Sequence, residues 1–488
     1  MANLLVFAIV IVFFAKTTAA STYNVKTMGA RTDGRTDSTK LFMAAWSGAC
    51  SASKPATIYV PQGRYLVSGL RFSGPCKNRA ITIRIDGTIV APSNLGNAEY
   101  WIRFNVVQGV TILGGTIDAQ GAGLWACKAS RKNCPAGATS LAIFNSNDVV
   151  VSGLSSLNSQ MFHIVVNGCH NVRLDGVNVV APWNSPNTDG IHVQLSTGVT
   201  ILNSKISTGD DCVSIGPGAT NLWIENVACG PGHGISIGSL GKDLKEEGVQ
   251  NVTVKRVTFK GTQNGLRIKA WARPSNGFVN GVLFQNAVMT NVENPIVIDQ
   301  NYCPGSKNCP RQVSGVRISN VKYQDVHGTS ATKVAVKFDC SKKNPCRGIT
   351  MQDVNLSFFK NKLQASAYCV NAAGRAAGVV KPTSCLLPSS SYVLSLFLPL
   401  FLLPSPDLDL AQEPPATGSA PVDQRVFSPL DFRLWIFRPP SSVLVFVAMA
   451  STVSTSRQAT APPSTMKLWR LALWYDLAVM SELWVRDD

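Results

Sequence analysis

The chain has 488 residues, enough for about two to four average domains or for one large repeat fold. Hydrophobic residues make up 45% of it and allow a substantial core, whereas charged residues make up only 15%, too few for an ordinary cytosolic enzyme. The formal net charge of +17 favours three anionic classes of partner: an acidic polysaccharide, an anionic membrane face or nucleic acid.

The N-terminus predicts export. An unbroken apolar run from Leu4 to Phe14 is followed by small residues that end at Ala20, where a signal peptidase would cut. The alternative is a buried N-terminal helix, and the run is too short to span a bilayer comfortably. We therefore expect residues 1–20 to be a signal peptide and the mature protein to be secreted, which disfavours nucleic acid as a partner.

Export makes disulfides the expected state of the 13 cysteines. Close spacing predicts three local bridges, and three wider pairs are further candidates: Cys127–Cys134, Cys303–Cys309 and Cys340–Cys346, then Cys212–Cys229, Cys50–Cys76 and Cys369–Cys385. Cys169 is then left unpaired, and the sequence does not fix the connectivity. The chain has no Cys-x-x-Cys pair with partner histidines, so we expect no zinc site.

Residues 21–50 are expected to cover the open end of a repeat array. Asp37 and Ser38 are suited to capping a helix that runs from Thr39 to Cys50. The apolar side chains on one side of this predicted helix are Leu41, Phe42, Ala45 and Trp46.

Between about residues 105 and 357 one short pattern recurs, in which a Gly, Asn or Asp opens an alternation of apolar and polar residues. The nine copies are 109–112, 148–151, 171–174, 198–201, 221–224, 251–254, 281–284, 315–318 and 348–351. Their separation is too long for a hairpin, and the helical pattern of a βαβ unit is absent. The repeat predicts an all-β fold, a parallel β-helix over residues 21–388. An all-β sandwich is the alternative.

Four polar clusters occupy consecutive coils, at similar distances after the repeated strand. They are 185–190, 208–212, 230–234 and 265–269. Because strands of neighbouring coils stack roughly 4.8 Å apart, these clusters are expected to project from one face. A single groove would then hold three carboxylates, one imidazole and two cations: Asp189, Asp210, Asp211, His233, Arg267 and Lys269.

This set of groups suits glycoside hydrolysis, in which one carboxylic acid protonates the leaving oxygen and another carboxylate activates water. Asp210 and Asp211 are adjacent, and two like charges so close raise one pKa. A regular strand would point them to opposite faces, so a local irregularity is expected. Arg267 and Lys269 face the same way and suit a sugar carboxylate. Glycines around His233 are expected to admit the polysaccharide close to the backbone.

The remaining features lie further along the chain. Asn251-Val252-Thr253 and Asn355-Leu356-Ser357 are candidate glycosylation sites of a secreted protein. Residues 389–488 lack the repeat, so we leave them unassigned and expect a disordered or non-native tail. A membrane tail is the alternative, but its apolar run from Val393 is broken by Pro399.

Over residues 22–385 the clusters resemble the signature of family 28 glycoside hydrolases, the polygalacturonases, and most closely the plant pollen-type members described as exopolygalacturonases. The matching residues are Asn187-Thr188-Asp189, Gly209-Asp210-Asp211, Gly232-His233-Gly234 and Arg267-Ile268-Lys269. The resemblance implies a single-stranded right-handed parallel β-helix of the pectin-lyase-like type. It also implies inverting hydrolysis of α-1,4-galacturonosidic bonds in the plant cell wall, by a monomer without metal or other cofactor.

The resemblance assigns roles as well. Asp210 resembles the proton donor, and Asp189 and Asp211 resemble the pair that activates water. His233 resembles the residue that supports protonation of the acid. Arg267 and Lys269 resemble the binders of the substrate carboxylate, and Asn187 and Tyr302 resemble residues of the substrate cleft.

Two other functions remain as alternatives. A pectate lyase-like β-helix enzyme would use calcium and an arginine base, and it would leave His233 without a role. A non-catalytic binder of acidic polysaccharide would not need the aspartates. The sequence leaves open whether cleavage is internal or from chain ends. We expect no membrane partner and no nucleic acid.

Overall fold

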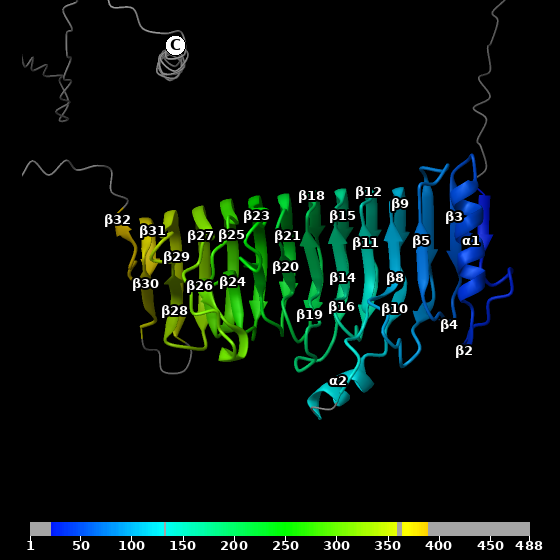
Figure 1. The fold of residues 1–488 in the computed structure, drawn as a ribbon, viewed down its shortest axis with the longest axis horizontal. Coiled ribbons are helices and arrows are strands. Elements are labelled where there is room, and N and C mark those ends of the chain that lie inside the picture. Colours follow the sequence, from blue (N-terminus) through cyan, green and yellow to red (C-terminus); the bar gives the residue numbers. More distant parts are fainter. Residues whose placement is uncertain (1–20, 131–132, 359–363, 389–488) are drawn as a thin grey trace, which may run out of the picture. The chain divides into compact units, whose positions relative to one another are not determined.

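The computed structural model describes residues 21–130, 133–358 and 364–388. The predicted signal peptide and the tail from residue 389 lie outside the described residues. Short strands stack in coils along the long axis of the described part, so that each coil covers the previous one (Figure 1). The predicted fold class, an all-β right-handed parallel β-helix, is confirmed.

One sheet has eleven strands, all parallel to their neighbours. It carries the site described below. In chain order its strands are β5 (Leu70–Ser73), β8 (Tyr100–Asn105), β11 (Thr139–Phe144), β14 (Ile164–Asn167), β17 (Ile191–Gln194), β20 (Val213–Ile215), β22 (Ile235–Leu240), β24 (Asn264–Trp271), β26 (Asn294–Tyr302), β28 (Val334–Asp339) and β30 (Ser366–Val370).

The other sheet has 21 parallel strands. Its members are β1 (Ser21–Asn24), β2 (Asp33–Asp37), β3 (Ala56–Val60), β4 (Arg64–Leu66), β6 (Ile81–Ile85), β7 (Thr88–Val90), β9 (Gln108–Leu113), β10 (Thr116–Asp118), β12 (Asn147–Ser152), β13 (Ser155–Leu157), β15 (His170–Asp175), β16 (Asn178–Val180), β18 (Thr197–Leu202), β19 (Lys205–Ser207), β21 (Thr220–Cys229), β23 (Val249–Lys260), β25 (Phe278–Val292), β27 (Arg317–Ser330), β29 (Cys346–Phe358), β31 (Ala372–Lys381) and β32 (Leu387–Pro388).

The backbone conformation explains which residue types open each copy of the repeat. Eight of the nine predicted copies open at a residue with positive φ, between 54° and 70°. Glycine and asparagine tolerate this left-handed conformation best. The residue turns the chain into the strand, and the next residues alternate between the core and the surface. These eight openers are Gly109, Asp148, Asn171, Gly198, Asn221, Asn251, Gly281 and Gly348.

The prediction for the eighth copy was wrong. Strand pairing matches Val282 with Val321, so the copy opens at Asn320, with φ of 54°, and not at Gly315. The error arose because Val316 and Ile318 are also buried and alternate in the same way. The array also extends before residue 105, through β3 and β6, whose strands lack an opening Gly, Asn or Asp.

The core is built from columns of aliphatic side chains that repeat from coil to coil. Val149 pairs with Val172, and Val172 pairs with Val199, and all three are buried. Burying each such side chain stabilises the fold by about 1.5–3 kcal/mol. Because the strands pair in register, a position that faces the core in one coil also faces the core in the next, and it is therefore apolar in both.

The predicted N-terminal cap is α1 (Thr39–Ser51), which lies at the end of the array (Figure 1). It buries Phe42 and Trp46, and the Trp46 ring centre lies 4.8 Å from that of Phe72. The predicted capping by Ser38 is wrong, since its side chain makes no capping hydrogen bond. The Asp37 carboxylate accepts from the Thr39 N–H instead, at 2.8 Å.

The six predicted disulfides are confirmed, and Cys169 is free and buried. Two further short helices interrupt the coils, α2 (Ala122–Ala129) and η1 (Pro304–Ser306). Across the described segments, no helix combines the length and apolar character needed to cross a membrane.

Candidate active site

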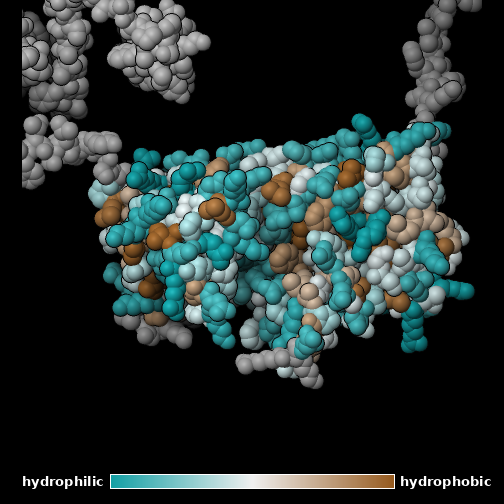
Figure 2. Space-filling view, viewed as in Figure 1, coloured by the Kyte–Doolittle hydropathy of each residue, from teal (hydrophilic) through white to brown (hydrophobic). Residues whose placement is uncertain are grey.

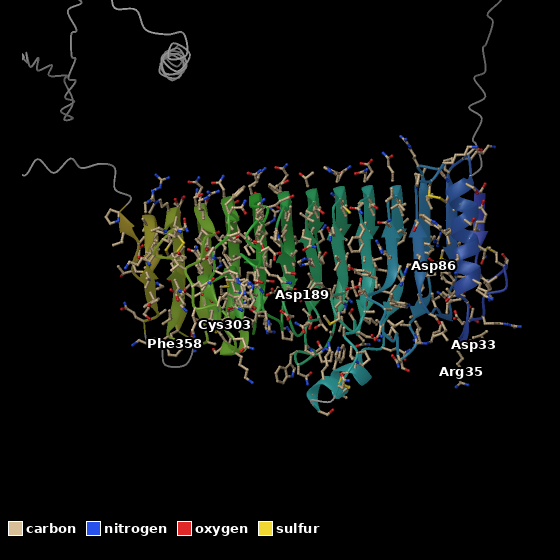
Figure 3. The ribbon with its side chains drawn as sticks, viewed as in Figure 1. Asp33, Arg35, Asp86, Asp189, Cys303 and Phe358 are labelled. Carbon is tan, nitrogen blue, oxygen red and sulfur yellow. A yellow bond between two sulfur atoms is a disulfide. The ribbon has the colours of Figure 1, made fainter. Side chains whose placement is uncertain are left out.

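Strand register brings three of the predicted residues to one position in consecutive coils. Ile191 pairs with Val213, and Val213 pairs with Ile235. Asp189, Asp211 and His233 each precede these paired residues by two positions. They therefore lie side by side where the chain enters β17, β20 and β22. Figure 3 labels Asp189 midway along the array, and the same face is hollowed near its middle in Figure 2.

Asp210 and Asp211 lie in a bend between β19 and β20, outside any strand. The predicted irregularity is confirmed, and it separates the environments of the two neighbours. The Asp211 side chain is only 1% exposed, and that of Asp210 is 19% exposed. The bend is fixed by the Asp211 N–H, which donates to Asp210 Oδ1 at 2.8 Å.

Both oxygens of Asp211 are bound by cations of β24. Arg267 Nη2 donates to Oδ1 and Lys269 Nζ donates to Oδ2, each at 2.7 Å. The Ser236 hydroxyl also donates to Oδ1, at 2.8 Å. Burial opposes ionisation of this carboxyl, but Lys269 and Arg267 outweigh it and hold the Asp211 pKa below its ordinary value. These contacts therefore favour the ionised form of Asp211.

Asp210 contacts the imidazole. His233 Nδ1 lies 3.0 Å from Asp210 Oδ1, and the His233 N–H donates to the Asp210 carbonyl at 2.7 Å. The two residues lie in adjacent coils, so this double contact fixes the ring against the carboxyl group. His233 is the more exposed partner, with 35% of its side chain accessible.

Asp189 differs from its neighbours. Its pKa is raised well above the ordinary value, first by burial and then by the nearby charges of Asp210 and Asp211. A hydrogen bond with Ser214 and the charge of Lys269 act in the opposite direction. The sequence led us to expect a raised pKa within the Asp210–Asp211 pair, but the pKa of Asp211 is lowered, and the raised pKa belongs to Asp189 in the preceding coil.

Hydroxyl groups join the loops that carry these aspartates. Thr188 Oγ1 lies 2.7 Å from both Ser185 Oγ and Thr208 Oγ1, and it accepts from the Gly209 N–H at 3.1 Å. A Cβ at Gly209 would come within 2.0 Å of the Ser185 carbonyl oxygen. The Asn-Thr-Asp and Gly-Asp-Asp motifs are thus one packed unit, and its threonines and glycine set the spacing of the carboxyl groups.

The glycines around His233 are required by the packing of neighbouring coils. A Cβ at Gly232 would lie 2.8 Å from the Asp210 carbonyl oxygen, and one at Gly234 would lie 2.1 Å from that of Asn264. These glycines allow neighbouring coils to approach each other. Coil packing already occupies the Cβ directions of these glycines, and the expectation that they also admit a polysaccharide close to the backbone stays a prediction.

The two predicted cleft residues lie beside the cluster. The ring centre of Tyr302, at the end of β26, is 5.3 Å from Lys269 Nζ. Asn187 is exposed in the turn just before Asp189, with φ of 56°. The structure therefore brings Tyr302 to the cations and Asn187 to the rim.

Sequence reasoning missed three polar residues of the site: His192, Ser214 and Ser236. They occupy paired outward positions of β17, β20 and β22. Single serines and histidines at such positions are ordinary surface residues of a strand. Only the register shows that they stand beside the aspartates.

Asp210, Asp211 and His233 offer ligand atoms within 4.8 Å of one another, a spacing that a metal ion could use. Both Asp211 oxygens already bind fixed cations, however, and Asp210 Oδ1 is held by His233. Such a neutralised donor set does not suit calcium, which requires several free oxygen ligands. It suits proton transfer.

Comparison with known families gives two matches. The family described as Glycosyl hydrolases family 28 matches residues 50–383. A second family, described as Rhamnogalacturonase A/epimerase, pectate lyase-like, matches residues 22–72. The first match contains all eight predicted site residues.

Two plant proteins are similar over most of their length. The chain is 63% identical to a polygalacturonase from Prunus persica over 385 residues, which are 78% of this chain and 98% of that protein. It is 42% identical to an exopolygalacturonase from Platanus acerifolia over 75% of this chain and 96% of that protein. A solved polygalacturonase from Erwinia carotovora superposes with a TM-score of 0.57 and 25% identity, covering 74% of this chain and 99% of that one.

Proposed function

The chain belongs to family 28 of the glycosyl hydrolases, and we propose that it hydrolyses the α-1,4-galacturonosidic bonds of polygalacturonate with inversion at the sugar carbon. One observation carries the proposal. Asp189, Asp210 and Asp211 lie together with His233 and the β24 cations in one cluster formed by four adjacent coils.

Asp210 is the proton donor in this mechanism. It is the least buried of the three carboxyl groups, so a glycosidic oxygen can reach it. After Asp210 gives up its proton, His233 Nδ1–H can donate to the carboxylate that forms. This contact stabilises the product of proton transfer and provides a route for reprotonation.

Asp189 and Asp211 activate the water. Asp211 remains ionised because of Arg267 and Lys269, so it can orient a water molecule without taking its proton. Asp189 has the raised pKa that makes a carboxylate a stronger base near the working pH. The three carboxyl groups have different catalytic roles because their surroundings differ.

Arg267 and Lys269 also bind the substrate carboxylate. A guanidinium has five N–H donors and an ammonium three. Arg267 directs one toward Asp211 and one toward Ser236, at 2.9 Å, and Lys269 directs one toward Asp211. The other donors are free to meet a galacturonate carboxylate, with the Tyr302 ring beside Lys269 and Asn187 at the rim.

The enzyme acts outside the cell, on pectin of the plant cell wall, as a secreted monomer. Six disulfides fit an oxidising compartment. The net charge of +17 complements an acidic polysaccharide. Both sequon asparagines, Asn251 and Asn355, are exposed, as glycosylation of a secreted protein requires.

Asp210→Asn tests the proposal. We expect reducing-sugar release from polygalacturonate to fall by at least about 100-fold, since general acid catalysis contributes roughly 10²–10⁴-fold. Asp175→Asn, at a half-buried aspartate of β15 that contacts Arg173 and Asn203, is the matched control and should keep full activity. Unchanged turnover by Asp210→Asn would remove the assigned acid. A calcium requirement, with unsaturated products that absorb in the ultraviolet, would favour a lyase.

A further inference from the structure

We propose that a basic pocket away from the catalytic cluster is a second binding site for polygalacturonate, which holds long chains while the cluster hydrolyses them. The pocket has a volume of about 550 Å³, and its lining includes the cations Arg317, Lys343 and Arg347. Its residues belong to β25, β27, β29 and the loop before β29, not to the sheet that carries the site. The choice of ligand rests on the proposed function.

Strand register brings the lining residues together from three adjacent coils. Phe278 of β25 pairs with Arg317 of β27. Ser319, two positions further along β27, pairs with Arg347 of β29. Lys343 lies in the loop that leads into β29. The three cations therefore come from two consecutive coils, and the coil before them supplies the aromatic ring.

The loop that carries Lys343 is fixed in place. The disulfide Cys340–Cys346 closes it, with a sequence separation of 6. Asn344 Nδ2 and Ser341 Oγ both donate to the Ser314 carbonyl in the preceding coil, at 3.0 and 2.9 Å. Binding therefore does not have to order this loop, which lowers the entropic cost of holding a ligand.

Phe278 gives the pocket an apolar surface. Its ring is half-buried and lies against Gly248 in the preceding coil, where a Cβ would come within 2.2 Å of Phe278 Cε1. In the same pocket, Ser319 Oγ donates to Asn280 Oδ1 at 3.1 Å. A sugar ring presents both C–H and hydroxyl groups, and an aromatic face with polar groups beside it suits such a ligand.

The three cations have no acidic partner. Across the described segments, none of them forms an ion pair, whereas other cations of the same sheet are paired locally, as in Arg173–Asp175 and Arg256–Glu225. None of the residues that line the pocket is acidic. A ligand with several carboxylates can pair with all three cations, and each arginine can bind a carboxylate through two hydrogen bonds.

A polymer gains more from such a pocket than a short oligomer does. The strands β24, β26 and β28 of the site sheet lead through loops into β25, β27 and β29, so the pocket and the β24 cations belong to neighbouring turns of the same coils. A chain held at the pocket is presented to the cluster at a high effective concentration. Only chains long enough to occupy both positions receive this gain.

The test compares kinetics on long polygalacturonate and on trigalacturonate. The pocket variant combines Arg317→Ser, Lys343→Ser and Arg347→Ser, all at exposed positions. We expect KM for the long chain to rise about 5- to 20-fold at low salt, because each exposed ion pair contributes only a few-fold. The kcat values and the KM for trigalacturonate should stay within about twofold. In about 1 M salt, where the screening length falls to about 3 Å, the difference should nearly vanish.

A control variant separates the pocket from net charge. Lys26→Ser, Arg31→Ser and Arg35→Ser remove the same charge from exposed positions of the N-terminal segment. Figure 3 labels Arg35 at the end of the array that carries α1, whereas β25, β27 and β29 lie toward the other end (Figure 1). This variant should keep KM for the long chain within about twofold.

A binding measurement removes the dependence on catalysis. In the Asp210→Asn background, electrophoretic migration through a gel that contains polygalacturonate should be retarded, and the three pocket substitutions should reduce this retardation while the three control substitutions leave it in place. If the parent does not hydrolyse polygalacturonate but the retardation still depends on the pocket, the proposed function fails and the binding site stands.

Three outcomes overturn the proposal. An unchanged KM for the long chain in the pocket variant would mean that the pocket does not bind the polymer. An equal rise in the pocket and control variants would assign the effect to net charge alone. An equal rise for trigalacturonate would make the pocket a part of the catalytic cleft and not a second site.

Discussion

The core and the site each contain a column of residues, meaning side chains at equivalent positions of adjacent coils. The core column is apolar, and the site column is polar. Val149, Val172 and Val199 occupy one register position in three coils and are buried with their own kind. Asp189, Asp211 and His233 also occupy one position in three coils. In the core, stacking repeats one favourable contact. At the site, it forces carboxyl groups together.

The difference shows how the fold produces chemistry. Burial and neighbouring carboxylates raise the pKa of Asp189, whereas two cations lower that of Asp211, one coil away. The repeat supplies the geometry, and each neighbour sets the charge state. Substitutions in the core should therefore change stability alone, and substitutions in the site should change activity together with stability, in either direction.

Asp211→Asn should have the largest effect on stability. It leaves Arg267 and Lys269 buried without their counterion, and breaking a buried ion pair in this way costs about 3–5 kcal/mol. Hydrolysis should fall by at least about 100-fold as well. Thermal unfolding monitored by circular dichroism, together with a reducing-sugar assay, measures both changes.

The destabilisation should depend on pH. The folded pKa of Asp211 is lowered, so its stabilising contribution is present above the ordinary value of 3.8 and is lost as pH falls through the folded pKa. The difference in the free energy of unfolding between the parent and Asp211→Asn should accordingly be large near neutral pH and small in acid. A gap that widens in acid would contradict the ion-pair explanation.

Leu174→Ala should affect the core column without affecting catalysis. Leu174 is fully buried in β15 and pairs with Val151 and Ile201 in adjacent coils. A buried leucine replaced by alanine costs about 2–5 kcal/mol. The thermal midpoint should fall, while kcat and KM at a temperature where the variant is folded stay within about twofold. A selective loss of kcat would show that core and site are coupled.

The sequence predicted most of the fold for a physical reason. A residue of left-handed backbone conformation, followed by alternating apolar and polar residues, marks each strand separately. Nine copies could therefore be recognised in the sequence without knowledge of how the coils are arranged in space. The coils at β3 and β6 escaped because no Gly, Asn or Asp opens them, and the eighth copy was misplaced because Val316 and Ile318 imitate the pattern.

Residues of the candidate site could be predicted from the sequence only where they belong to recognisable motifs. The aspartates, His233, Arg267 and Lys269 stand in clusters of unusual composition. Ser214 and Ser236 stand in ordinary strand positions and become site residues through register. The opposite pKa shifts of Asp189 and Asp211 depend on which side chains face each carboxyl group, and a linear sequence does not contain that information.

Asp189→Asn should have the smallest effect on stability and the opposite sign. The folded pKa of Asp189 is raised, so below about pH 3.8 both states are protonated and the residue is neutral to stability. As pH rises, the unfolded chain ionises first, and stability falls until pH passes the folded pKa. The amide carries no charge, so the variant should be inactive yet more stable than the parent, with a gap that opens above about pH 4 and then levels off. Thermal midpoints across pH 3–8 measure it. A variant less stable than the parent at pH 7 would mean that hydrogen bonds stabilise the Asp189 carboxylate by more than the burial of its charge costs. Substitution at this site position would then destabilise the protein, as substitution in the core does.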